Sequence, residues 1–164
     1  MEDKHQHLEI EQSLALKNFF EMCIHGLHNF KATQPRQFLD TLGIDYHSVQ
    51  VGFISGQAHH RKPESFREPL VKIGILTPSD AAVRSSELKA YTSFGNYSIA
   101  FPLKSETGEI VNLYAYRFKL QTPKGEFLNE QGLYPSFPSD KTTRLYLTQT
   151  VFDAVGLLQG SSIN

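Results

Sequence analysis

The stretch YSIAFPLKSETGEIVNLYAYRF, Tyr97–Phe118, determines the fold expected for this chain. Two β-rich segments flank SETGE, in which Gly108 can adopt the positive φ that a tight hairpin turn needs. Side chains alternate along the second segment, so one face carries Val111, Leu113 and Ala115 and the other carries Asn112, Tyr114, Tyr116 and Phe118. The stretch therefore predicts a β-hairpin whose two faces have different environments.

The residues before this hairpin have a helical pattern. From about Glu9 to Asn29, apolar residues recur at three- and four-residue spacing, which indicates an amphipathic helix. TQPRQFLDTLG predicts a second helix, with Thr33 as N-cap, Pro35 in the first turn and Gly43 just past the end. Three more short helices are expected in IDYHSVQVG, capped by Asp45 and ended by Gly52, in PESFREPLVKIG, and in TPSDAAV, with Thr77, Pro78 and Asp80 in a capping box.

The residues after the hairpin mix strand and helix signals. GEFLN resembles a third short strand, and GLYPSFPSD is a loop interrupted by prolines. TRLYLT predicts a strand, and VFDAVGLLQ predicts a helix ended by Gly160. The expected fold is α+β: N-terminal helices packed on a small antiparallel sheet, with a C-terminal strand–helix unit.

Composition limits the classes of function. The 164 residues include 16 basic and 17 acidic side chains, a formal net charge of −1, so a nucleic-acid surface would have to be local. The single cysteine excludes a disulfide within the chain and a cysteine-based zinc site. Without a secretory signal or an apolar run long enough for a membrane span, we expect a cytoplasmic protein with no membrane contact.

Other candidate sites are weaker. His25 and His28 are three residues apart on a helix but have no predictable third ligand, so no metal site is expected. The cluster from His59 to Lys62 fits a solvated loop better than a phosphate contact. Cys23 lies in an apolar register and fits a core position, and no catalytic motif is present.

The hairpin is the strongest candidate surface, with two interpretations. Tyr114 and Tyr116 could stack on unpaired bases while nearby cations hold the phosphate backbone. These cations are Lys104, Arg117, Lys119 and Lys124. Alternatively, the aromatic rings pack beneath the N-terminal helices, which composition alone favours.

The order of these segments resembles the catalytic core of bacterial DNA primases from about Leu14 to Gln159. The resemblance lies in QFLDTLGIDYHSVQVGFISG, PLVKIGIL, the Phe-Pro hairpin with its glycine turn and terminal arginine, and GEFLN. LYLTQTVFDAVGLLQ resembles the first strand and helix of the Toprim fold, a metal-binding nucleotidyl-transfer module. The resemblance implies an N-terminal helix in residues 1–32, a primase-core-like region in 33–140 and a degenerate Toprim start in 141–164, within one compact domain.

The resemblance also implies roles for single residues. Phe101, Pro102 and Gly108 would build the hairpin, Arg117 would face nucleic acid, and Asn129 would match the asparagine of a family motif. Departures from the family pattern are equally informative. Gln149 and Thr150 replace a catalytic Glu-Gly pair, although Asp153 matches the aspartate that follows it, and Glu126 replaces an expected lysine. Ser98, Ala115 and Tyr116 depart as well, and no later Asp-x-Asp strand follows.

These observations predict a primase-like module that binds single-stranded DNA or RNA, or serves as an accessory factor, in replication or in a mobile element. The isolated chain is not expected to be an active enzyme or to need a cofactor, and no residue is assigned to a metal. Mg²⁺ would bind only if a longer parent supplied the missing carboxylates. Two alternatives stay open: a fragment of an active primase or Toprim enzyme, and a protein-interaction domain on a primase-derived scaffold.

Overall fold

The computed structural model describes residues 2–79, 90–122 and 124–160. They form four helices and two antiparallel sheets, so the predicted α+β class is confirmed. The helices are α1 (Glu2–His28), α2 (Thr33–Thr41), α3 (Glu64–Lys72) and α4 (Val151–Gly160). The strands are β1 (Gly52–Ile54), β2 (Leu76–Ser79), β3 (Ala90–Ser93), β4 (Ser98–Lys104), β5 (Ile110–Arg117) and β6 (Lys124–Phe127).

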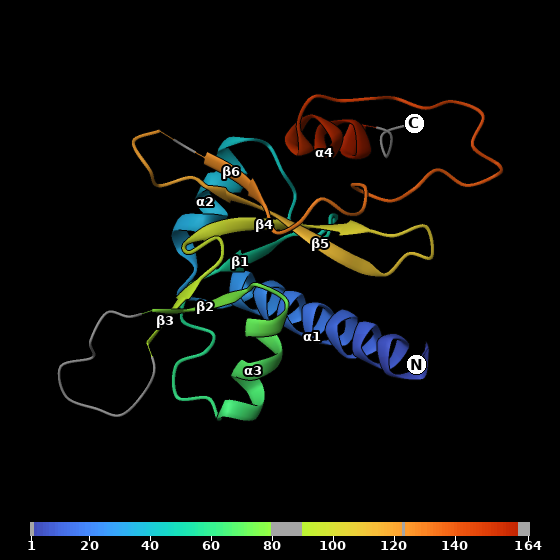
Figure 1. Cartoon of the computed structure of the whole chain (residues 1–164). Helices are drawn as coiled ribbons and strands as arrows, with labels where there is room; N and C mark the ends of the chain where they lie inside the picture. The colour runs from blue at the N-terminus through green and yellow to red at the C-terminus, as the bar shows by residue number, and fades with distance from the viewer. Residues whose placement is uncertain (1, 80–89, 123, 161–164) are drawn as a thin grey trace.

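The larger sheet has the strand order β1-β4-β5-β6 and lies between two helical layers. Helices α1 and α3 lie on one side of it, and α2 and α4 lie on the other (Figure 1). The predicted hairpin is confirmed, because β4 and β5 pair with Phe101 opposite Tyr114, and Gly108 turns the chain with φ +85°. Strands β2 and β3 form a separate two-stranded sheet.

Each face of the sheet has its own hydrophobic core. On the α1 side, Phe20, Leu113 and Ala115 are completely buried. On the α2 side, Leu39, Phe101 and Val155 are completely buried. A central strand buried on both faces explains why β4 has an almost continuous apolar sequence rather than a strict alternation.

Strand β1 lies unusually close to α1, and Gly52 makes this approach possible. A Cβ at Gly52 would lie only 2.7 Å from the Cβ of Cys23. Cys23 is buried as predicted, and burial raises the pKa of its thiol far above the ordinary value. A protonated, enclosed thiol behaves as a small hydrophobic side chain.

Helices α1, α2, α3 and α4 and strand β6 confirm the corresponding predictions, but the expected boundary at Thr33 was wrong. Thr33 is the first residue of α2, and Ala32 is the N-cap without a side-chain hydrogen bond. IDYHSVQVG does not form a helix either. Asp45 holds a single turn, since its carboxylate accepts a hydrogen bond from the His47 N–H at 3.0 Å, and Gly52 begins a strand instead of ending a helix.

Two further predictions of secondary structure were wrong. Thr77 and Pro78 belong to β2, whose pairing with β3 overrides the local capping signal, and Asp80 lies outside the described residues. TRLYLT, residues 143–148, forms no strand, because no strand of the described chain lies beside it. Strands β1 and β3 were not predicted, since three or four residues are too few for a period-two pattern.

Candidate nucleic-acid interface

The four predicted cations fall into two groups at opposite ends of the hairpin. Lys104 pairs with Ile110 at one end of β5, and Arg117 pairs with Lys124 at the other. Ile110 and Arg117 are seven residues apart along the strand, roughly 23 Å at about 3.3 Å per residue. Lys104 therefore cannot contact the same phosphate as Arg117. The local concentration of charge is at the β5–β6 end, where Lys119 and Lys124 accompany Arg117.

Arg117 is the most constrained of these cations. Its Nη2 donates to Oε1 of Glu126 at 2.8 Å, and the two side chains are 34% and 26% exposed. The buried Nε of Arg117 has no hydrogen-bond partner among the described residues. Sequence analysis noted Glu126 only as a departure from a lysine. Glu126 becomes a partner of Arg117 only once the register of β5 and β6 is known. In that register Ala115 lies opposite Glu126 and Arg117 lies opposite Lys124, so Arg117 and Glu126 are diagonal neighbours.

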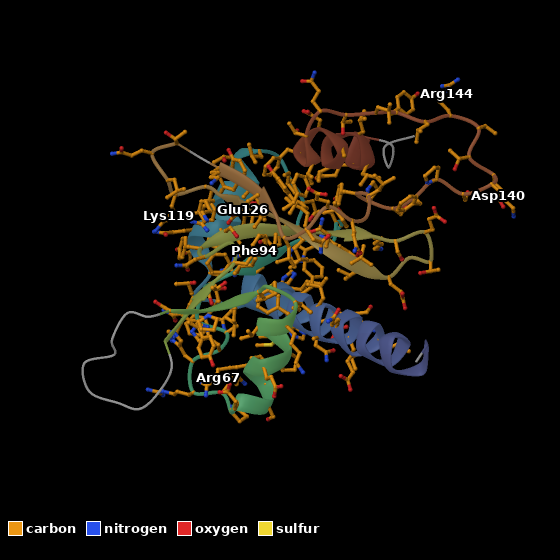
Figure 2. All side chains as sticks on the ribbon, viewed as in Figure 1. Arg67, Phe94, Lys119, Glu126, Asp140 and Arg144 are labelled. Atoms are coloured by element: carbon orange, nitrogen blue, oxygen red, sulfur yellow. The ribbon has the colours of Figure 1, made fainter. Side chains whose placement is uncertain are left out.

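Lys119 lies at the same end of the sheet and is positioned by an aromatic ring. Its Nζ lies 4.6 Å from the ring centroid of Tyr97, a cation–π contact. The Tyr97 hydroxyl in turn donates to Oε1 of Gln34 at 2.8 Å. Figure 2 labels Lys119 and Glu126 at this end of the sheet. Lys119 is exposed, and the ring of Tyr97 gives its ammonium a defined position two residues after Arg117 in the chain.

The aromatic face of β5 is mostly occupied by protein. Tyr116 stacks on Phe38 of α2 at a centroid distance of 5.8 Å and meets Phe152 of α4 edge-on at 4.9 Å. Tyr114 packs against Phe127 at 4.9 Å, and burial, with a smaller contribution from Tyr116, raises the pKa of Tyr114. Tyr116 therefore packs beneath the N-terminal helix α2, as the second interpretation expected, but also against the C-terminal helix α4, whereas Tyr114 packs against β6. Stacking of bases on these rings stays a prediction and would have to displace these neighbours.

Asn129 takes part in a network of hydrogen bonds within the protein. Its Nδ2 donates to the Val111 carbonyl at 2.8 Å, and its Oδ1 accepts from the Gln131 N–H at 2.8 Å. The buried amide of Asn112 binds the same segment, donating to the carbonyls of Asn129 and Gln131. The two amides together hold residues 129–131 against β5. Asn129 therefore has a structural role in the described chain, and its contact with nucleic acid stays a prediction.

Gln149 and Asp153 lie at the start of α4. The Thr150 hydroxyl donates to Oδ2 of Asp153 at 2.7 Å and accepts from the Asp153 N–H at 3.1 Å, an N-terminal cap that sequence analysis missed. Gln149 lines a groove of about 670 Å³ together with Asn112 and Asn129. The groove thus brings Gln149 and Asn129 together. Within the described part of the chain, no group of three or more His, Cys, Asp or Glu side chains could hold a metal ion.

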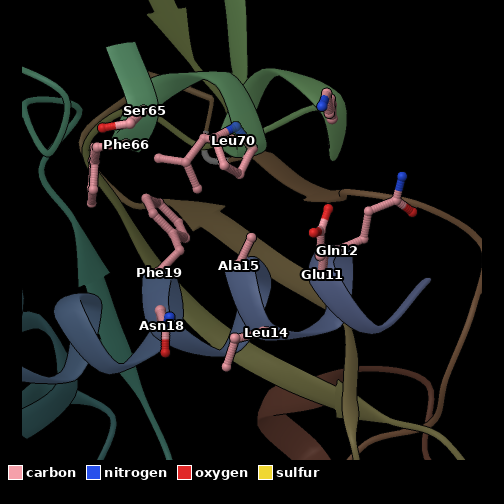
Figure 3. Close-up of a pocket in the computed structure, with 11 residues that line it drawn as sticks. Glu11, Gln12, Leu14, Ala15, Asn18, Phe19, Ser65, Phe66 and Leu70 are labelled. Atoms are coloured by element: carbon pink, nitrogen blue, oxygen red, sulfur yellow. The ribbon is translucent and has the colours of Figure 1, made fainter. Parts of the chain in front are cut away.

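Two further features lie away from the predicted residues. A groove of about 370 Å³ separates α1 from α3 and is lined by apolar side chains such as Phe19, Phe66 and Leu70 (Figure 3). His59 is only 7% exposed and packs against Tyr91, and burial lowers its pKa, with smaller contributions from the charges of His60 and Arg67. The expected solvated loop therefore has one buried histidine.

Comparison with known proteins identifies the fold. No protein-family model and no curated protein matches the chain. Solved structures do match. A DnaG primase catalytic domain bound to ssDNA has a TM-score of 0.62 at 16% identity, over 76% of this chain and 39% of that one. A primase domain from Pseudomonas aeruginosa has a TM-score of 0.58 at 15% identity, over 77% and 40% of the two chains.

A third match is the RNA polymerase domain of Mycobacterium tuberculosis DnaG in complex with a double-stranded DNA oligomer with a 6-nucleotide overhang. It has a TM-score of 0.57 at 18% identity, over 76% of this chain and 40% of that one. The predicted resemblance to the primase catalytic core is confirmed at the level of the fold. The chain spans about two fifths of the length of these structures. No helix in the described ranges is both long and apolar enough to cross a membrane.

Proposed function

We propose that this chain is a primase-like module that binds single-stranded nucleic acid and does not polymerise by itself. It would act as an accessory module in replication or in a mobile element. The observation that best supports the proposal is the shared fold with a primase catalytic domain bound to ssDNA. The cluster of Arg117, Lys119 and Lys124 at one end of the sheet supplies the charge that such binding requires.

Binding at this cluster would be modest and sensitive to salt. Three cations neutralise at most three phosphates, and the net charge of −1 adds no long-range attraction. For single strands, the slope of log K against log salt is about −0.7 per phosphate, so three contacts predict a slope of about −2. Phosphate contacts do not read bases, so we expect little sequence preference.

The proposal of an incomplete catalytic site rests on Gln149 and Thr150. The family resemblance would place a Glu-Gly pair there, but an amide is a poor ligand for Mg²⁺. The Thr150 hydroxyl is already used as the cap of α4. Metal-dependent transfer would thus need carboxylates from elsewhere, either in a longer parent chain or in a partner.

The proposal can be tested by fluorescence anisotropy with a labelled single-stranded 20-mer of DNA, and of RNA, at low salt. Arg117→Ala should weaken binding about tenfold, because a charge-assisted contact to phosphate is lost. Lys72→Ala is the matched control, because it removes a cation from α3, where Lys72 pairs with Glu68 at 3.2 Å. No binding by the wild type, or equal binding by both variants, would contradict the proposal.

A second function is favoured by one observation, the apolar surface of residues 143–148. Leu145 is 62% exposed and Leu147 is 89% exposed, in a segment that forms no strand. Large exposed apolar side chains close together along the chain are typical of interaction surfaces. If this segment binds a protein, Leu145→Ser with Leu147→Ser should abolish any self-association or partner binding seen by sedimentation, without changing the fold.

A further inference from the structure

Three charged side chains project from one face of the β5–β6 pair. Arg117 lies opposite Lys124 in the register, and Glu126 is two residues further along β6. Residues two apart on a strand point to the same face, so Lys124 and Glu126 flank the guanidinium of Arg117. The observed contact between Arg117 Nη2 and Glu126 Oε1, at 2.8 Å, agrees with this arrangement.

The carboxylate of Glu126 accepts a hydrogen bond from the guanidinium of Arg117, the same group that a phosphate would bind. Both are anions that accept hydrogen bonds from guanidinium N–H groups, so they compete for the same donors. The pair is partly open to solvent, with side chains 34% and 26% exposed. Because the pair is not sealed from solvent, an incoming phosphate can reach the guanidinium and compete with the carboxylate.

We propose that Glu126 is an internal competitor for nucleic-acid phosphate at Arg117 and thereby sets the affinity of the interface. This inference rests on the proposed function and adds a residue that limits it. In the free protein, Glu126 neutralises Arg117 and leaves Lys124 and Lys119 as the first contacts for a phosphate backbone. On binding, phosphate replaces the carboxylate, which then lies close to the bound anion and opposes it.

Removing the charge of Glu126 should therefore strengthen binding. Glu126→Gln keeps the size of the side chain, so the strand pairing of β6 should survive. We expect affinity for a single-stranded oligothymidylate of about 20 nucleotides to rise roughly threefold to tenfold at low salt, because the change removes one competing anion beside the bound phosphate. A residue that only stabilised the sheet would show no gain in affinity.

The experiment measures anisotropy with the labelled oligothymidylate for four chains: wild type, Glu126→Gln, Arg117→Ala and the double variant. Glu68→Gln is the matched control, because it removes the same charge from an exposed ion pair on α3. We expect Glu126→Gln to bind more tightly, Glu68→Gln to equal the wild type, and the gain from Glu126→Gln to shrink when Arg117 is absent. Thermal unfolding followed by circular dichroism confirms that each variant is folded.

The outcomes separate this inference from the proposed function. If the wild type binds and Arg117→Ala weakens binding, but Glu126→Gln binds no better than the wild type, the competitor role is wrong and the proposed function stands. If the wild type fails to bind while Glu126→Gln binds, the proposed function of the native chain is wrong, whereas the competition between Glu126 and phosphate is supported. If no folded variant binds at low salt, both are overturned.

Discussion

The β4–β5 hairpin and the segment from residue 141 to the end of α4 differ in how far their sequence patterns were realised. The hairpin was predicted and forms, since each strand has a partner and each face has a core. TRLYLT was also predicted as a strand, but in the structure Leu147 of this segment is 89% exposed and none of the described strands pairs with it. The comparison shows that a strand pattern becomes a strand only where a neighbour supplies hydrogen bonds.

Helix α4 belongs to the second region but, unlike the loop before it, is packed on the core. Its Val155 is completely buried in the core that also contains Phe101. Figure 2 places Asp140 and Arg144 on the outer loop that precedes the helix, away from the sheet. The packing of Val155 against the sheet therefore holds α4 in place, whereas residues 141–150 before the helix are exposed and have little packing to stabilise them.

Truncation of one core residue in each region should give the largest difference. Phe101→Ala removes a fully buried ring that contacts Tyr134 and Phe152, and should lower the free energy of unfolding by about 3–5 kcal/mol. Leu147→Ala should change it by less than about 0.5 kcal/mol, because the side chain is already in solvent. Urea unfolding followed by circular dichroism measures both. Similar losses from the two substitutions would break the comparison.

Two glycines give a smaller and opposite pair of effects. Gly52→Ala places a Cβ 2.7 Å from that of Cys23, so β1 must move away from α1. This should lower the free energy of unfolding by about 1–3 kcal/mol. Gly156→Ala is the matched control within α4, where an added Cβ meets nothing within 4 Å. It should stabilise the chain by up to about 1 kcal/mol. Chemical unfolding would refute this account if Gly52→Ala were neutral.

The smallest effect is expected from His59, away from both regions. Burial lowers the pKa of His59 below its ordinary value of 6.5, so the unfolded chain binds this proton more readily. His59 therefore leaves the free energy of unfolding unchanged above about pH 6.5 and lowers it as the pH falls below that value. His59→Phe keeps a ring against Tyr91 and should remove this part of the pH dependence. Urea unfolding at pH 7.5 and 5.5 measures it, and an unchanged pH dependence in the variant would exclude His59 as the cause.

Sequence analysis identified the hairpin and the main helices because these depend on long periodic patterns and on turn residues such as Gly108. The primase-like fold was expected from the resemblance of the ordered segments to a known family, and the structural matches confirm it. Sequence analysis missed β1 and β3, which are short and exist through pairing. It grouped Lys104, Arg117, Lys119 and Lys124 as one set of cations, whereas the strand register puts Lys104 at one end of β5 and Arg117 and Lys124 at the other. The ion pair with Glu126 and the helix cap by Thr150 depend on three-dimensional register, which a linear sequence does not specify.

The central claim is that Arg117, Lys119 and Lys124 form an interface for the phosphates of single-stranded nucleic acid. The most direct test measures how the affinity for labelled oligothymidylate changes with salt in the wild type and in Arg117→Ala. The account predicts a slope of log K against log salt of about −2 for the wild type and about −1.4 for the variant, one phosphate contact fewer. Equal slopes, or an affinity that does not depend on salt, would contradict it.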